Sequence, residues 1–421
     1  MESAQPGAIL TTADGAPLKQ SLGRALRREK TVSLLLVAPL FLFIVVTFLI
    51  PIADMLLRGV DNKIVSEQIP RAVALLAEWD GGGGELPGEA VFSAMVADLQ
   101  KGAKAKTINR LGKRLNYEKS GMSSLFRKSA RRVLRLKEGP YREALVKIDR
   151  RWGDIQTWQL IKTFSPPYTG GYFLTAVDMR LDPAEGIVRQ QEDRRIYLNL
   201  FGRTLWLSAL ITLLTLLLGY PIAYLLATLP TRTSNLLIIL VLLPFWTSLL
   251  VRTTSWIALL QQEGVINDVL VAVGILDNDS RLAMIHNRIG TVVAMTHILL
   301  PFMVLPLYSV MKTIPPSYMR AAVSLGAHPA LAFLRIYVPN TVPGMGAGGI
   351  LVFILAIGYY ITPALVGGSS GTFISNFIAN HISSTLNWGL AAALGMLLLA
   401  IVLALYLLYD RIVGIDNMKL G

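Results

Sequence analysis

Long stretches without charged residues dominate this sequence and limit what it can fold into. A hydrocarbon core about 30 Å thick is crossed by about 20 mostly apolar residues in a helix. Six segments are long and apolar enough for this: 31–57, 204–228, 236–260, 289–311, 341–361 and 388–409. The third contains Pro244 and Arg252 and the fourth contains His297, so these two should be the least regular. The sequence therefore predicts an all-α integral membrane protein with six transmembrane helices.

The composition and the residue types present agree with that class. Charged residues make up 16% of the chain, whereas a soluble globular protein has about a quarter. There is no cysteine, which excludes a disulfide framework, a thiolate metal site and a cysteine nucleophile. The four histidines are scattered and lack ligand spacing. We expect no metal site and no catalytic residue in this chain.

Basic residues determine the expected orientation. Lys19, Arg24, Arg27, Arg28 and Lys30 stand directly before the first apolar segment, and the positive-inside rule keeps such a tail in the cytoplasm. Alternating the spans from there leaves the last residues, with Arg411 and Lys419, inside as well, and 367–387, which has no Lys or Arg, outside. The predicted order is a cytoplasmic basic tail (1–30), transmembrane helix 1 (31–57), an external (periplasmic) insert (58–203), a transmembrane core (204–410) with a cytoplasmic loop (312–340), and a cytoplasmic tail (411–421).

The large insert between helices 1 and 2 is basic, with 26 Lys and Arg against 17 Asp and Glu. Long loops are translocated across the membrane largely regardless of their charge, so the basic composition of the insert is compatible with an external position. The insert should be mostly helical, and within Ser124 to Arg135 we expect Leu125, Phe126, Val133 and Leu134 to share one helical face, with the basic residues elsewhere on the helix. The basic remainder of that helix either faces water or binds RNA, an anionic lipid surface or an acidic protein; we expect the solvated face.

The loop before the fifth apolar segment contains a distinctive pattern. Pro315 and Pro316 suit a helix start, Ser317 to Leu325 can form two turns, and Gly326 supplies the open backbone position of a sharp C-terminal turn. The small residues Ala321 and Ala322 let another protein approach this helix closely. The pattern favours a short docking helix at the cytoplasmic surface.

This segment resembles the EAA loop of binding-protein-dependent importer permeases, which reads Glu-Ala-Ala, three residues, Gly, and about nine residues later Ile-x-Leu-Pro. Arg320 replaces the usual Glu and reverses the charge at the start of the helix. The resemblance implies that the segment couples to an ATPase through Arg320, Ala321, Ala322, Gly326, Ala327, Phe333, Ile336 and Pro339.

Further segments are similar to the spermidine/putrescine permeases: 219–224, 243–252, 300–308 and 362–368. The resemblance implies a type I ATP-binding cassette importer fold in the bacterial inner membrane, surrounded by lipid. A second permease chain, expected to form a heterodimer, two copies of an ABC-type ATPase and a periplasmic substrate-binding protein would be the partners, with no nucleic acid. The substrate would be a polyamine or a related small organic solute.

No Gly-x-x-x-x-Gly-Lys-Ser/Thr phosphate loop occurs in the sequence. ATP and Mg would therefore be bound and ATP hydrolysed by the partner ATPase, and this chain would hold no cofactor. The alternative is an ion-coupled secondary transporter, which needs ionisable groups inside the membrane; Asp54 and His297 are the only Asp, Glu or His residues in the six segments. A membrane-bound enzyme acting through the insert lacks any nucleophile or metal constellation.

Four residues are candidates for lining a translocation path: Trp246, Arg252, Tyr359 and Tyr360. Aromatic faces attract organic cations, but in membrane spans such residues more often pack or anchor at the interface. Arg252 lies near the external end of its span, where snorkelling to the interface is the simpler interpretation.

Overall fold

The computed structural model describes residues 18–81 and 83–413, and the chain divides into two units at Leu57 and Arg58. The first unit is one helical segment made of α1 (Leu18–Ile44), a π-helical turn (Val45–Leu49) and α2 (Ile50–Leu57). Its apolar stretch, Glu29–Leu57, is long enough to span a membrane, and none of it is buried by the protein. A helix that is apolar on every side suits lipid. The first 17 residues of the predicted cytoplasmic tail lie outside the described residues, as do 414–421.

The second unit begins with a helical domain that has its own hydrophobic core. Its helices are α3 (Lys63–Gln68), α4 (Pro70–Glu78), α5 (Glu89–Lys104), α6 (Ile108–Asn116), α7 (Met122–Val133), α8 (Tyr141–Ile148) and α9 (Ile155–Thr163). Trp152 and Trp158 are fully buried in this core. The Trp152 indole N–H donates to Ser129 Oγ at 2.8 Å, and the Trp158 indole N–H donates to the Trp152 carbonyl at 2.9 Å. Both indoles thus bury their rings without leaving a donor unpaired.

The amphipathic helix predicted in the insert is present as α7. Leu125, Phe126 and Val133 are fully buried, so they lie on one face as predicted. The prediction was wrong for Leu134, which is 49% exposed, because the helix ends at Val133 and the chain turns away.

The last part of the insert contacts both the insert's own core, through Leu181, and the spanning helices. It contains α10 (Gly171–Ala176) and an antiparallel hairpin of β1 (Met179–Asp182) and β2 (Gly186–Arg189), in which Met179 pairs with Arg189. Tyr172 and Ala176 of α10 share a buried cluster with residues of α11 and α22. The insert therefore comprises a helical domain that ends near Phe164 and a connector that lies between this domain and the membrane bundle and contacts both.

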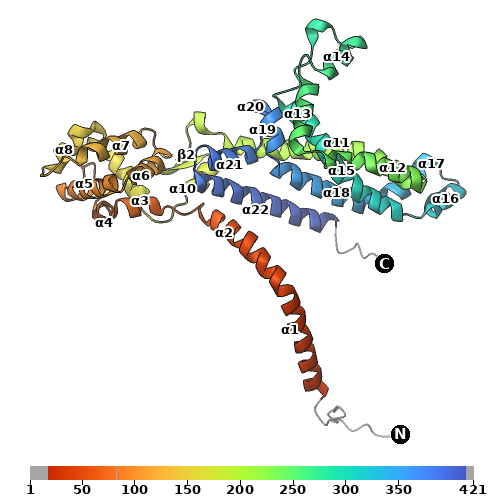
Figure 1. Cartoon of the computed structure of the whole chain (residues 1–421), viewed down its shortest axis with the longest axis horizontal. Coiled ribbons are helices and arrows are strands. Elements are labelled where there is room, and N and C mark those ends of the chain that lie inside the picture. Colours follow the sequence, from red (N-terminus) through yellow and green to blue (C-terminus); the bar gives the residue numbers. More distant parts are fainter. Residues whose placement is uncertain (1–17, 82, 414–421) are drawn as a thin grey trace. The chain divides into compact units, whose positions relative to one another are not determined.

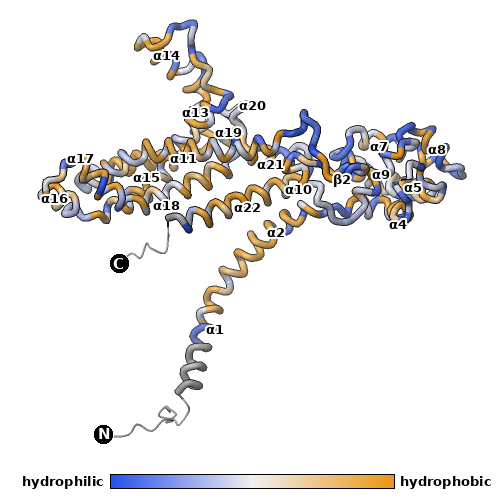
Figure 2. The backbone as a smooth tube through the Cα atoms, turned by 180° about the vertical axis from the view of Figure 1, so that it is seen from behind, coloured by the Kyte–Doolittle hydropathy of each residue, from blue (hydrophilic) through white to orange (hydrophobic). Residues whose placement is uncertain are grey.

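The bundle consists of α11 (Tyr197–Thr228), α15 (Arg288–Thr313), α18 (Val338–Gly358) and α22 (Trp388–Val413). A core around Met303, Leu307 and Val352 joins α11, α15 and α18. Gly348 permits this contact, since a Cβ there would lie 2.8 Å from Met303 Sδ. Hydropathy colouring shows these helices as mainly apolar and the insert as mixed (Figure 2).

The third predicted span is broken in the structure. The predicted span, 236–260, falls in α12 (Thr231–Leu242), a 3-10 turn (Leu243–Trp246) and α13 (Leu249–Leu260), and α14 (Val265–Ala272) follows it. The segments Thr231–Trp246 and Leu249–Ala272 are bent by 96° relative to each other. Pro244 lies in the turn and Thr247 is extended, so the helical hydrogen bonds stop there. The described residues contain five helices long enough to cross a membrane, or six if the bent pair counts as one span.

Short helices complete the unit: α16 (Pro316–Ser324), α17 (Pro329–Ala332), α19 (Ile361–Val366), α20 (Gly368–Gly371) and α21 (Ile374–Ser383). Figure 1 shows α16 and α17 at one end of the bundle and the helical domain of the insert at the opposite end. The predicted cytoplasmic loop and the predicted external insert are thus separated by the length of the spanning helices.

Candidate functional site

The segment predicted to dock another protein forms a short helix with a sharp stop. Helix α16 begins with Pro316 in its first turn and ends at Ser324. Gly326 follows at φ +90°, its N–H donates to the Val323 carbonyl at 3.0 Å, and the Ala327 N–H donates to the Ala322 carbonyl at 3.1 Å. These two bonds and the left-handed glycine form a Schellman motif, which satisfies the last carbonyls of the helix. The helix and glycine turn predicted from the sequence are both present.

The chain then returns to the bundle through a ring cluster. After α17, a π-helical turn (Phe333–Tyr337) leads directly into α18. The ring of Phe333 lies 5.4 Å from that of Tyr224 in an edge-to-face arrangement and 5.4 Å from that of Tyr337 in a stacked one. Phe333 therefore fixes the segment to α11.

The predicted coupling residues divide by exposure. Arg320, Ala321, Gly326 and Pro339 are exposed, Ala327, Phe333 and Ile336 are half-buried, and Ala322 is buried. The small side chain of Ala322 thus serves packing inside the segment. Sequence reasoning missed the exposed apolar residues: Tyr318, Val323, Leu325, Leu331 and Leu334. Leu325 is 89% exposed, and its place directly before the turn glycine is the signal that could have identified it.

Three of the four predicted pathway residues lie at two breaks of the helical bundle, and the fourth, Arg252, lies on α13. Trp246 lies at the break between α12 and α13 and is 87% exposed. Tyr359 and Tyr360 lie between α18 and α19, where Ser375 Oγ donates to the Tyr359 carbonyl at 2.6 Å. Arg252 is half-buried on α13, and its Nε is buried without a hydrogen-bond partner in the described part of the chain. Local breaks expose backbone and side chains at membrane depth, which is tolerated where they line a cavity or another protein.

A hydrogen-bonded and packed junction joins the insert to the bundle. The Tyr117 hydroxyl lies 3.1 Å from the Thr385 carbonyl and 3.2 Å from the Leu386 carbonyl, and donates to one of them. The ring of Tyr172 packs so closely on Gly389 that a Cβ there would lie 2.4 Å from it. Burial raises the pKa of Tyr172 to about 12, because the phenolate would lose its hydration. The end of α21 and the start of α22 are therefore firmly attached to the insert.

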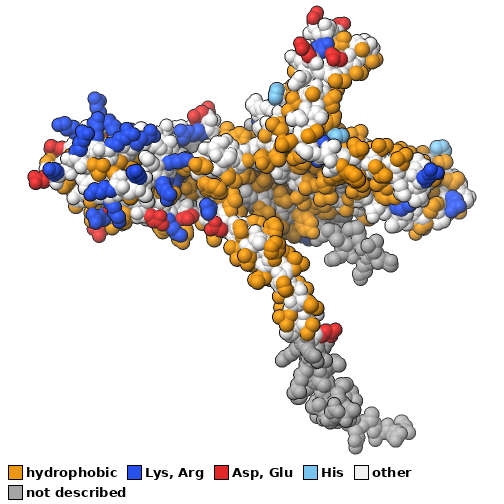
Figure 3. Space-filling model, in the orientation of Figure 1, with side chains coloured by type: hydrophobic (Ala, Val, Ile, Leu, Met, Phe, Trp, Pro, Cys, Tyr) orange, Lys and Arg blue, Asp and Glu red, His pale blue; other side chains and the backbone are white. Residues whose placement is uncertain are grey.

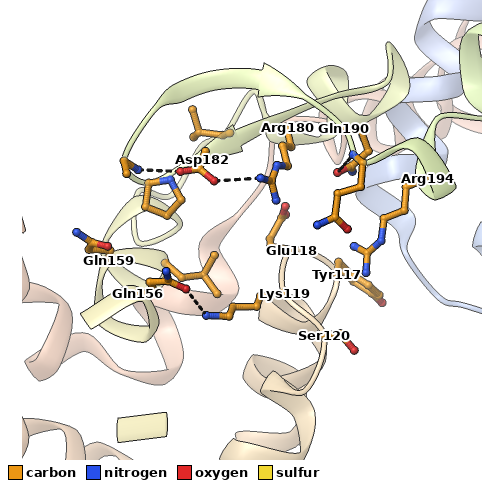
Figure 4. A pocket seen from close by; sticks show the side chains of 15 residues that line it. Tyr117, Glu118, Lys119, Ser120, Gln156, Gln159, Arg180, Asp182, Gln190 and Arg194 are labelled. Carbon is orange, nitrogen blue, oxygen red and sulfur yellow. Dashed lines mark hydrogen bonds and ion pairs between the residues drawn. The ribbon is translucent and has the colours of Figure 1, made fainter. Parts of the chain in front are cut away.

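A polar cavity of about 510 Å³ lies beside this junction (Figure 4). Its walls come from the loop after α6, from α9 and from the β1–β2 hairpin. Several of its side chains interact with each other: Lys119 Nζ donates to Gln156 Oε1 at 3.1 Å, and Arg180 pairs with Asp182 at 3.3 Å. The cavity contains no histidine, and its lining residues form no nucleophile and base pair. In the described ranges, no group of three or more His, Asp or Glu side chains is arranged to hold a metal ion.

Comparison with known proteins identifies the class. Residues 206–414 match the family described as binding-protein-dependent transport system inner membrane component. The spermidine/putrescine transport system permease protein PotB of Haemophilus influenzae is 32% identical over 53% of this chain and 78% of its own length, and PotB of Escherichia coli K12 is 33% identical over 53% and 81%. The inner membrane ABC transporter permease protein YdcU of E. coli K12 is 31% identical over 50% and 70%.

The crystal structure of a bacterial ABC transporter that imports alginate is also similar, with 18% identity, a TM-score of 0.43 and coverage of 55% of this chain and 81% of that one. The chain belongs to the family of binding-protein-dependent transport system inner membrane components. It is a multi-pass inner-membrane permease subunit of an ABC importer, which confirms the resemblance and the fold class expected from the sequence. The family match begins at residue 206, after the insert.

Proposed function

We propose that this chain forms half of a translocation pathway for a polyamine or a related small organic solute and is driven by a separate ATPase. A second, different permease chain would form the other half, a periplasmic binding protein would deliver the substrate, and two ATPase copies would dock on the cytoplasmic side. Both termini would be cytoplasmic. The names of the PotB relatives support the substrate class.

The observation that carries the proposal is the segment from α16 to the π-helical turn. It combines a helix with a sharp glycine stop, exposed apolar side chains and an aromatic anchor on α11. An exposed side chain such as Leu325 is unfavourable in water and favourable in a partner's groove, since burying a leucine contributes about 2 kcal/mol. The segment also lies at the end of the bundle opposite the insert, as coupling from the cytoplasm to an external receptor requires.

Arg320 is exposed on α16 where the family pattern has a carboxylate. An ATPase that fits this chain would therefore present an acidic rather than a basic group at that position. ATP and Mg would be bound by the ATPase, because this sequence has no phosphate loop.

The test is the substitution Gly326→Pro in the assembled importer. Proline fixes φ near −65° and has no N–H, so it is incompatible with the φ of +90° and removes the bond to the Val323 carbonyl. Substrate-stimulated ATP hydrolysis should fall to the unstimulated rate, and the ATPase should dissociate during mild detergent purification.

Gly274→Pro is the matched control. Gly274 has a φ of +76° and also donates its N–H to the carbonyl three residues earlier, at 3.0 Å, but it lies in the loop after α14. Gly274→Pro should keep the ATPase bound and stimulated. Normal stimulated hydrolysis in the Gly326→Pro complex would refute the proposed coupling role.

A further inference from the structure

Positive charge is concentrated in one part of the insert. Residues 99–137, which include the C-terminal end of α5 and all of α6 and α7, contain 13 Lys and Arg and one carboxylate, Glu118. The whole insert is far more balanced, with 26 basic and 17 acidic residues. Figure 3 shows Lys and Arg side chains gathered on the surface of the insert around α7.

The outer side of α7 forms the centre of this surface, and we call Arg127, Lys128, Arg131 and Arg132 the basic face. All four are exposed, while the opposite side of the helix fills the insert core. Lys128 pairs with Asp149 at 3.2 Å. Within the described residues, the other three side chains make no ion pair and no hydrogen bond.

This arrangement is unfavourable for the isolated insert. Arg127 and Arg131 are four residues apart, as are Lys128 and Arg132, and like charges at this spacing repel each other on a helix. The helix dipole offsets some of this cost for Arg131 and Arg132, which lie in the last turn. Arg127 lies too far from that end to benefit, so packing and capping leave the cluster unexplained.

The surface around these side chains is hollowed rather than flat. One hollow of about 270 Å³ is lined by Ser124 and the basic face, and another of about 220 Å³ lies between α6 and α7, with Lys106, Asn109, Arg127 and Arg131 in its wall. Guanidinium groups offer paired N–H donors that match a carboxylate. Two such hollows fit Asp and Glu side chains that protrude from a protein surface.

We propose that the basic face docks an acidic surface of the periplasmic substrate-binding protein, an inference that rests on the proposed function. The location excludes simpler partners. Helix α7 belongs to the part of the insert at the far end from the spanning helices (Figure 1), which keeps it away from the headgroups of the same membrane. A free polyamine is a cation and is repelled by these residues. Charge complementarity at the rim of such an interface mainly accelerates association.

The experiment uses the complete importer in nanodiscs and the binding protein that restores substrate uptake in proteoliposomes. Its affinity for the complex is measured by biolayer interferometry at 50 and 300 mM salt. The test variant carries Arg127→Glu, Arg131→Glu and Arg132→Glu together, and a second variant carries glutamine at the same positions, which removes the repulsion and keeps the helix. The control variant reverses three exposed, dispersed cations of the insert, Arg142, Lys147 and Arg189.

We expect the test variant to bind about tenfold or more weakly at low salt, mainly through slower association, and the glutamine variant to show an intermediate loss. The control variant should stay within about twofold of the wild type. Poly-glutamate should compete with the binding protein on the wild-type complex and lose this effect on the test variant.

Unchanged affinity in the test variant, or an equal loss in the control, would overturn this proposal alone. Binding of the wild-type complex in nanodiscs to added vesicles of phosphatidylglycerol and phosphatidylethanolamine that the test variant loses, with receptor affinity unchanged, would overturn it in favour of lipid. If no binding protein supports uptake by the wild-type complex, the proposed function fails and this inference fails with it.

Discussion

Arg114 is a buried cation that connects the insert core to the junction, and replacing it with methionine should destabilise the insert locally. The residue is 2% exposed. Its Nε donates to Asn62 Oδ1 at 2.8 Å and its Nη1 pairs with Glu118 at 2.6 Å. The guanidinium also lies over the rings of Phe164 and Tyr172, at 5.2 and 4.7 Å. Methionine keeps the packing of the aliphatic stem and removes all of these polar contacts.

The expected loss of stability follows from the partners of Arg114 that remain buried without it. Removing one partner of a buried ion pair typically costs about 3–5 kcal/mol, because the other charge remains buried and unpaired. The Nη2 atom of Arg114 already lacks a partner within the described residues, so the lower end, about 3 kcal/mol, applies. In a domain of roughly 100 residues each kcal/mol shifts the melting temperature by about 4–8 °C. The helical domain should therefore melt roughly 15 °C lower.

Hydrogen exchange measured by mass spectrometry on the detergent-solubilised chain reports this locally, since opening of the insert speeds exchange of its amides. Protection should fall in α3, α6 and α9 and remain unchanged in α15. Arg110→Met is the control, because Arg110 is one turn earlier on α6 and exposed; surface changes of this kind stay within about 0.5 kcal/mol. Equal protection in the two variants would refute the structural role of Arg114.

Two further predictions concern the junction and the acid stability of the insert. Gly389→Ala places a methyl group 2.4 Å from the buried Tyr172 ring and should lower the free energy of unfolding by about 1–3 kcal/mol. Gly395→Ala on the same helix is the control, because its methyl group meets nothing within 4 Å and should not destabilise the protein. Equal melting temperatures of the two variants would contradict the close packing at Gly389. Hydrogen bonds from Arg151 hold the pKa of the Asp149 carboxyl group in the folded protein well below its usual range. The stability that the Asp149 carboxylate contributes is therefore fully present above the pKa of the unfolded state, near 4. It is lost as the pH falls through the pKa of the folded state. Asp149→Asn should therefore lower the free energy of unfolding at pH 7 by about 2 kcal/mol. The variant should also lose less stability than the wild type as the pH falls below 4. Melting temperatures that fall with pH equally in the variant and the wild type would refute this.

The sequence predicts the spanning helices well because the bilayer imposes a simple rule on length and polarity. The third span shows where the rule ends. Pro244 indicated irregularity, but the 96° bend depends on which neighbours satisfy the freed backbone groups, and apolar periodicity carries no such information. The coupling segment was predictable for a local reason, since the Schellman motif involves only residues 322–327. The contacts of Phe333 with Tyr224 join residues more than 100 positions apart and were not.

Arg114 illustrates the limit within the insert. The sequence shows it as one of many basic residues, and Arg110 on the same helix looks equivalent. Its position next to Leu111 and Leu115 on the apolar side of α6 is the local sign of burial, yet its partners come from the start of the insert, from Phe164 and from Tyr172. A charged side chain is buried only where partners compensate for its lost hydration, and here these partners are distant in the sequence. For the same reason the connector after Phe164 was not distinguished from the rest of the insert.

One helix connects the two ends at which partners are proposed to bind. Asp178, in the connector, accepts hydrogen bonds at 2.9–3.0 Å from the Ile196, Tyr197 and Leu198 amides and so holds the first turn of α11. The helix continues for 32 residues, about 48 Å at 1.5 Å per residue, and near its other end Tyr224 contacts Phe333 of the coupling segment. Because helices resist stretching far more than loops do, we expect a displacement of the connector to move the start of α11 and, through this helix, the anchor of the coupling segment. Docking at the insert and docking at α16 would thus act on the same element.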